Sequence, residues 1–331
     1  MPITYQWSSN SVPVTGATNN TYTALAALGD TVYSCLVSNP VGTANLSVTL
    51  TGLPYLTLDW NGAGWMANGG GTFNNGVLTL TDGGGSETRS AFFGTQQYIG
   101  AFEASFTYQA GGSKAADGVA FVLQNDPRGA TALGGGGGSL GVSGITPSAE
   151  LELNLYNGST QIRGYSFKTN GLTGASGANG NYTTLGNVSL NAGNPVNFYL
   201  YYSQGMLSMM VTDTVAATSF STNLNVGNLT AIAGGSFAYV GFTGASGGST
   251  AVQTITDFTF LSLMDLAAQS SGTNLVLAWP NDVSLYQLQS ATNLITPVWV
   301  NVNSPVTVTN NMNEVTVPAT GAQVFYRLIL Q

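Results

Sequence analysis

The chain has 331 residues, of which 43% are hydrophobic and only 6% are charged, and its 14 acidic and 6 basic residues give a formal net charge of −8. So few basic residues provide no patch that could neutralise a phosphate backbone, which excludes nucleic-acid binding. The chain has no histidine and one cysteine, Cys35. These counts exclude serine-triad chemistry, histidine-ligated zinc and an internal disulfide.

Serine, threonine, asparagine, glutamine and the 44 glycines must therefore make up most of the surface, a composition typical of proteins outside cells. We expect a secreted or cell-surface protein. The N-terminal stretch MPITYQWSSN lacks a basic region and an apolar core, so any signal peptide would have been removed or would lie upstream. No apolar run reaches the roughly 18 to 20 residues that span a bilayer, and no membrane span is predicted.

Short segments in which apolar and polar residues alternate dominate the chain, and clusters of glycine, asparagine and serine separate them. Alternation with a period of two is typical of β-strands, and it recurs at 76–82, 102–109, 150–157, 197–202, 207–213 and 253–260. No helix is predicted. The sequence predicts an all-β protein in three parts: residues 1–52, a glycine-rich body over 56–262 and a C-terminal module over 266–331.

Residues 1–52 contain Trp7 and, after it, the segment GDTVYSCLVSNPVG, in which Asp30, Tyr33 and Cys35 have the spacing of a tyrosine-corner motif. The pattern resembles strands C to G of an immunoglobulin-like domain. The resemblance implies that strands A and B would precede Met1, which leaves one apolar sheet face with little to cover it. Two interpretations stay open. The chain is part of a longer multi-domain protein, or neighbouring copies supply the missing strands and the protein assembles by strand complementation.

The body over 56–262 contains, in order, DWNGAGWMANGGGTFNNGVLTLTD, YIGAFEASFTYQAGG, AADGVAFVLQND, LGGGGGSLGVSGI, SAELELNLYN and AYVGFTGASGGSTAVQTITDFTF. Together these motifs resemble the legume-lectin-like (L-type lectin) domain of secreted bacterial proteins. The resemblance implies a concanavalin-like jelly-roll sandwich with a flat back sheet and a curved front sheet. Two small immunoglobulin- or fibronectin-like sandwiches would flank it, the first of them incomplete.

The resemblance also implies a sugar site on loops above the front sheet. Asp117 matches the aspartate whose carboxylate accepts hydrogen bonds from two sugar hydroxyls, and the peptide bond from Ala116 would be cis. The glycine run 134–138 matches a loop whose backbone N–H approaches the same sugar. Without the surrounding motifs, Asp117 would be interpreted as a turn-capping residue before glycine. The candidate carbohydrate-binding residues are Asp117, Gly135, Gly136, Gly137, Asn157 and Ser246.

The metal-binding stretch of that family aligns with residues 152–158, and the sequence departs from it there. Asn154 stands in place of the first calcium-binding aspartate, and the ligand asparagine is displaced to Asn157. Calcium takes roughly six to eight oxygen ligands that include carboxylates. We expect the transition-metal site to be lost. If calcium is retained, its ligands would be Glu152, Asn154 and Tyr156, and no other cofactor is expected.

Glu150, Glu152, Asn154 and Tyr156 alternate, so they project from one face of a predicted strand. A similar pattern, Glu-x-Asp-x-Glu, carries the catalytic acids of laminarinase-like glucanases, whose retaining mechanism needs two carboxyls about 5 Å apart. Here Asn154 stands at the position of the final acid. We therefore expect no glycoside hydrolase activity and interpret the two glutamates as polar groups on a sheet.

The C-terminal segment resembles a small β-sandwich module that ends secreted proteins of Verrucomicrobia-like bacteria, on the evidence of Trp279-Pro280, YQLQSATNL, Trp299 and the closing Phe325 to Leu328. Its aromatic residues are interpreted as core. Two functions are predicted for the whole chain. One is an extracellular, adhesive protein that binds a glycan or polysaccharide. The other is a structural subunit of a surface layer or filament, in which copies assemble by strand complementation of the incomplete N-terminal domain and the lectin site has decayed.

Overall fold

The computed structural model describes residues 3–22, 29–52, 58, 60–158, 161–176, 181–263, 266–280, 286–293, 297–309, 312–319 and 324–330. The chain forms two compact units. Residues Leu56–Leu263 make the larger unit, and Met1–Tyr55 together with Met264–Gln331 make the smaller one. The predicted first and third parts thus belong to the same unit. The all-β class is confirmed, since β-strands make up both units.

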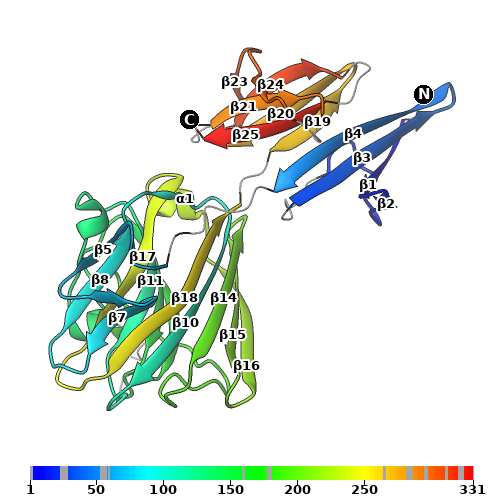
Figure 1. Ribbon diagram of the computed structural model, residues 1–331. Helices are drawn as coiled ribbons and strands as arrows, with labels where there is room; N and C mark the ends of the chain where they lie inside the picture. The colour runs from blue at the N-terminus through cyan, green and yellow to red at the C-terminus, as the bar shows by residue number, and fades with distance from the viewer. Residues whose placement is uncertain are drawn as a thin grey trace. The chain divides into compact units, whose positions relative to one another are not determined.

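The larger unit is a sandwich of two seven-stranded sheets (Figure 1). The back sheet runs, in spatial order, β16 (Thr218–Asn225), β15 (Met206–Asp213), β14 (Val196–Ser203), β10 (Phe102–Gly111), β18 (Val252–Ser262), β7 (Val77–Asp82) and β6 (Thr72–Asn74). The front sheet runs β13 (Gly164–Thr169), β12 (Ser148–Asn154), β11 (Gly118–Gln124), β17 (Phe237–Ala245), β8 (Thr88–Phe93) and β5 (Trp65–Asn68), with β9 (Gln97–Tyr98) paired to β17.

The core between the two sheets is filled by the apolar residues of the alternating segments. Phe106 of β10 stacks on Phe198 of β14, with ring centroids 4.9 Å apart. Phe242 of β17 meets Phe106 edge-on at 5.1 Å and Phe258 of β18 at 5.0 Å. These rings join the sheets, and aromatic pairs in such geometries contribute beyond the area that they bury.

The far side of the front sheet is also covered by protein, so strands β11 and β12 are buried on both faces. A second, smaller apolar cluster joins Phe92, Ala120 and Val122 of the sheet to three residues of the connection between β11 and β12: Ala132, Val142 and Ile145. This connection contains two short 3-10 helices, Gly129–Thr131 and Gly137–Ser139. It therefore lies over the outer face of the front sheet and brings Gly137 of the glycine run close to Asp117, just before the start of β11.

A single helical turn, α1 (Leu229–Ile232), is the one α-helix among the described residues. Asn228 caps its N-terminus by accepting hydrogen bonds from the N–H groups of Thr230 and Ala231, the usual role of asparagine at this position. No helix in the described part of the chain is long and apolar enough to cross a membrane.

The smaller unit contains three sheets. The N-terminal sheet has the order β2 (Val12–Pro13), β1 (Thr4–Ser9), β3 (Gly29–Asn39) and β4 (Gly42–Gly52). In this sheet Trp7 lies opposite Cys35; the side chain of Asp30 lies outside the described residues. The C-terminal residues form a sheet of β19 (Ala267–Ser271), β20 (Asn274–Pro280), β24 (Met312–Pro318) and β23 (Thr307–Thr309), and another of β22 (Val300–Asn301), β21 (Tyr286–Ala291) and β25 (Phe325–Leu330).

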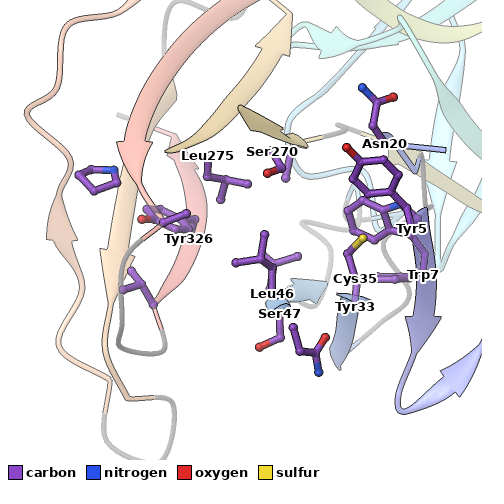
Figure 2. A pocket seen from close by; sticks show the side chains of 16 residues that line it. Tyr5, Trp7, Asn20, Tyr33, Cys35, Leu46, Ser47, Ser270, Leu275 and Tyr326 are labelled. Carbon is purple, nitrogen blue, oxygen red and sulfur yellow. The ribbon is translucent and has the colours of Figure 1, made fainter. Parts of the chain in front are cut away.

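A cavity of about 570 Å³ lies inside the smaller unit, between the N-terminal sheet and the C-terminal strands. Figure 2 shows Trp7, Tyr33 and Leu46 on one wall, with Leu275 and Tyr326 across the cavity. The expected apolar face is therefore covered in part by residues of the same chain. Trp7, Tyr33 and Cys35 are buried, and Tyr22 contacts the rings of Trp7 and Tyr33. Strand complementation by a neighbouring copy stays a prediction.

The aromatic core predicts how much stability the larger unit loses when a core side chain is replaced by alanine. Phe242→Ala removes a fully buried ring and should lower the free energy of unfolding by about 3 to 5 kcal/mol in a urea titration. Met210→Ala, on the outer face of β15 where the side chain is 51% exposed, should change it by less than about 0.5 kcal/mol. Similar losses in the two variants would contradict this packing.

Candidate functional site

Asp117 lies at the entrance of β11, where three segments that are distant in sequence meet. Its N–H donates to the carbonyl of Ala245 at the end of β17, over 3.1 Å, and its carbonyl accepts from the N–H groups of Leu155 (2.8 Å) and Tyr156 (3.2 Å) beyond β12. The Ala116–Asp117 peptide bond is cis, as the resemblance implied. The backbone of Asp117 is thus fixed from both neighbouring strands.

The carboxylate of Asp117 has little contact with solvent and lacks a full set of partners. The residue is 8% exposed, and Oδ2 is buried with no hydrogen-bond donor among the residues that the structure describes. Burial raises the pKa of this carboxyl to about 6, because the charged form is disfavoured away from water. A buried acceptor without a donor is costly for a fold, and a ligand with hydroxyl groups would satisfy it.

Two glycines form the wall around this oxygen. A Cβ atom at Gly137 would lie 3.8 Å from Asp117 Oδ2, and one at Gly247 would lie 3.1 Å away. Gly137 also has a φ of +58°, which favours glycine, and its N–H meets no carbonyl of the described residues. Asp117, Gly137 and Gly247 therefore place a buried carboxylate oxygen beside two residues that have no side chains. We call these three residues the Asp117 notch.

Two other candidate glycines shape the loop and do not face the carboxylate. Gly135 donates to the carbonyl of Ser143 over 2.9 Å and accepts from the N–H of Gly141 over 2.8 Å. A Cβ atom at Gly136 would collide with the side chain of Thr88. Gly136 needs to be glycine because the loop lies close to β8 at that point, whereas a Cβ atom at Gly135 would make only ordinary contacts.

Ser246 and Asn157 differ from their expected positions. Ser246 is completely buried: its Oγ donates to the carbonyl of Gly84 over 2.8 Å and accepts from the N–H of Glu87 over 3.1 Å. Its side chain ties two loops together, and the notch is lined instead by the next residue, Gly247. Asn157 is exposed beyond β12, and no contact joins it to the notch.

Sequence reasoning missed two neighbours of the notch. A Cβ atom at Gly138 would lie 3.9 Å from Gln161 Nε2, so this side chain borders the glycine loop; its Oε1 is buried without a partner among the described residues. Tyr182 lies close enough to Glu152 and Asp117 for their charges to raise the pKa of its hydroxyl, although burial is the largest cause. Neither residue belongs to a periodic segment or a motif that would have identified it.

The residues named as calcium ligands are only in part hydrogen-bonded within the protein, since Glu152 Oε1 and Asn154 Oδ1 are buried without a partner among the described residues. Glu152 Oε2 accepts from the N–H of Gly174 over 2.9 Å. The side-chain amide of Asn154 donates to the carbonyl of Tyr156 over 2.8 Å. No cluster of three or more histidine, cysteine, aspartate or glutamate residues occurs in the described part of the chain. This donor set does not fit a calcium ion, which takes oxygens and prefers carboxylates.

The two glutamates of β12 do not form an accessible catalytic pair. Glu150 and Glu152 are completely buried; Glu150 accepts from the hydroxyl of Ser148 and from the N–H of Gly171. Burial raises the pKa of both carboxyls to about 7. A glycosidase needs both acids to reach the substrate, and the loops over the front sheet prevent this. The geometry agrees with the expectation of a protein that is not a glycosidase.

Comparison with solved structures identifies the architecture of the larger unit. The basic lectin of winged bean, solved with the Tn antigen, superposes with a TM-score of 0.50 at 18% identity, covering 61% of this chain and 93% of the lectin. A lectin from Bauhinia forficata, solved with GalNAc, gives 0.50 at 17% identity, covering 62% and 94%. Neither a protein-family model nor a curated protein sequence matches the chain. The larger unit has the fold of the legume lectins.

The buried acids predict how stability depends on pH. In the unfolded chain Glu150 and Glu152 ionise near their ordinary value of 4.5, whereas in the fold they keep a proton up to about pH 7. Between these values the unfolded chain binds fewer protons, so the free energy of unfolding falls as the pH rises. The Tm should be lower at pH 8 than at pH 5.

Replacing both acids with glutamine should flatten this dependence, because a neutral amide has no proton to lose. A rise in pKa from 4.5 to about 7 corresponds to a loss of about 3 kcal/mol in the free energy of unfolding at high pH, for one isolated and fully buried carboxyl. The measurement is calorimetric Tm against pH for the double variant Glu150→Gln/Glu152→Gln, with Glu103→Gln on the outer face of β10 as control. If the Tm of the double variant fell with pH as steeply as that of the natural protein, Glu150 and Glu152 would not be the source of the pH dependence.

Proposed function

We propose that this protein binds carbohydrate at the Asp117 notch. The observation that supports the proposal is the buried Asp117 Oδ2, which has no partner among the described residues and faces Gly137 and Gly247. A sugar offers adjacent hydroxyl groups that can donate to the carboxylate and accept from a backbone N–H at the same time. Hydrogen bonds to an ionised carboxylate are about twice as strong as neutral ones.

The fold supports this class of ligand without naming the sugar. The winged bean and Bauhinia forficata lectins were solved with the Tn antigen and with GalNAc, and the larger unit shares their architecture. The shortage of charged residues argues against an anionic ligand held by ion pairs, because no basic residue forms part of the notch. We therefore propose a neutral glycan or polysaccharide as the ligand.

We further propose that the protein acts outside the cell, secreted or at the cell surface, and that glycan binding serves adhesion. The support is compositional: a surface of hydroxyl and amide side chains with few charges is typical of extracellular proteins. The smaller unit would then present the lectin-like unit without taking part in recognition.

A glycan array tests this proposal with the full-length protein. Asp117→Asn keeps the shape of the side chain but removes its charge and one acceptor, and should weaken binding to any array hit by at least about tenfold. Asp257→Asn makes the same change of charge at an exposed, irregular position of β18 in the back sheet and should leave binding unchanged. Absence of binding to every glycan, or equal binding by Asp117→Asn, would refute the proposal.

The dependence of glycan affinity on pH gives a separate prediction. The carboxyl of Asp117 has a pKa of about 6, and the ionised form accepts more strongly from hydroxyls than the protonated form does. Affinity for an array hit should therefore be constant above pH 7 and fall as the pH drops through 6, as measured by titration calorimetry between pH 4.5 and 8. Affinity that is flat across this range would contradict the role of Asp117.

A further inference from the structure

The segment that follows β12 is hydrogen-bonded to the backbone of Asp117 in the Asp117 notch. The N–H groups of Leu155 and Tyr156 both donate to the carbonyl of Asp117. The position of these two residues therefore determines where the backbone of Asp117 lies. Whatever holds residues 155 and 156 in place also holds the notch.

The carbonyl groups of the same two residues are held by side chains. Asn154 Nδ2 donates to the carbonyl of Tyr156 over 2.8 Å and to that of Ile162 over 2.8 Å. Arg163 Nε donates to the carbonyl of Leu155 over 2.9 Å. Two side chains thus connect the end of β12 to the start of β13. Asn154, which makes two of these three hydrogen bonds, is 1% exposed.

The direction of the Asn154 amide follows from its partners. A carbonyl oxygen only accepts, so the atom between Tyr156 and Ile162 has to be a donor or a cation. The amide NH₂ group supplies one proton to each carbonyl. Its Oδ1 points away and has no partner in the described part of the chain, which is the cost of this orientation.

A divalent cation is disfavoured at the same place. The oxygens around Asn154 Nδ2 are the neutral carbonyls of Tyr156 and Ile162. The acid in the aligned stretch, Glu152, accepts from Gly174 through Oε2, which leaves Oε1 as its one oxygen without a partner among the described residues. The positively charged guanidinium of Arg163 contacts the neighbouring carbonyl of Leu155. Calcium requires about six to eight oxygens, carboxylates among them, and would be repelled by the arginine. Asn154 Nδ2 and Arg163 Nε already donate hydrogen bonds to the carbonyl oxygens that a cation would otherwise bind.

We propose that Asn154 and Arg163 do the work of a structural cation, so that the notch is ordered without any divalent metal. Both are positioning residues: they act on Asp117 through the backbone of residues 155 and 156. The inference rests on the contacts of this segment and is independent of the proposed function, since the stability of the larger unit reports on it whether or not a glycan binds.

The first test is the Tm of the full-length protein, measured by calorimetry with excess EDTA and with excess calcium chloride. The Tm should be the same in both, because a ligand that binds the native state raises the Tm only if it has a site. A Tm that rises with calcium or falls with EDTA would overturn the proposal.

The second test replaces Asn154. Asn154→Asp puts a carboxylate where two carbonyls need donors, and should lower the Tm by about 3 to 10 °C in EDTA. Asn157→Asp makes the same change of charge three residues further on, at an exposed side chain, and should leave the Tm unchanged. Excess calcium should recover part of the loss in Asn154→Asp, because the variant supplies the carboxylate that the natural site lacks.

Two results would overturn the role of the side chains. One is an Asn154→Asp variant that melts no lower than Asn157→Asp. The other concerns Arg163→Lys, which keeps the positive charge but removes the Nε donor to Leu155 and serves as the test if Asn154→Asp does not fold. It should also melt below the Asn157→Asp control, and a Tm equal to that control would show that the guanidinium does not hold the segment.

Discussion

The carboxylate of Asp117 is held against glycine by its own backbone, which donates to the end of β17 and accepts from the segment beyond β12. These hydrogen bonds fix the backbone of Asp117, and Oδ2 is buried without a donor from the described residues. The packed core between the sheets stabilises the fold enough to tolerate this one unsatisfied acceptor.

Three acids with raised pKa values lie in the front sheet or directly before one of its strands. Asp117, Glu150 and Glu152 lie at the entrance of β11 and along β12, and burial raises the pKa of each. The two glutamates accept from loop N–H groups at Gly171 and Gly174, so they tie the covering loops to the sheet. Asp117 is 8% exposed, whereas the two glutamates are completely buried, so of these three acids only Asp117 fits the recognition role that we propose.

Sequence reasoning predicted the parts of the structure that follow a pattern. Period-two alternation placed β7, β10, β14, β15 and β18 of the back sheet but only β12 of the front sheet. The ordered motifs led to the fold and to Asp117. Side-chain direction in loops has no period, which is why Ser246 was chosen while the adjacent Gly247 lines the notch. The role of Arg163 was also invisible, because its partner Leu155 belongs to another segment. The grouping of residues 1–55 with 264–331 depends on contacts between segments that are distant in sequence. Such contacts cannot be predicted from the pattern of either segment alone.

The ionisation of Asp117 tests the central claim most directly. The side-chain carboxyl carbon can be followed by NMR in the ligand-free protein between pH 3 and 9, and assigned by its loss in Asp117→Asn. The account predicts a midpoint of about 6, because the carboxylate is buried and short of donors. A midpoint near the ordinary value of about 4 would show a solvated or fully partnered carboxylate and would contradict the account.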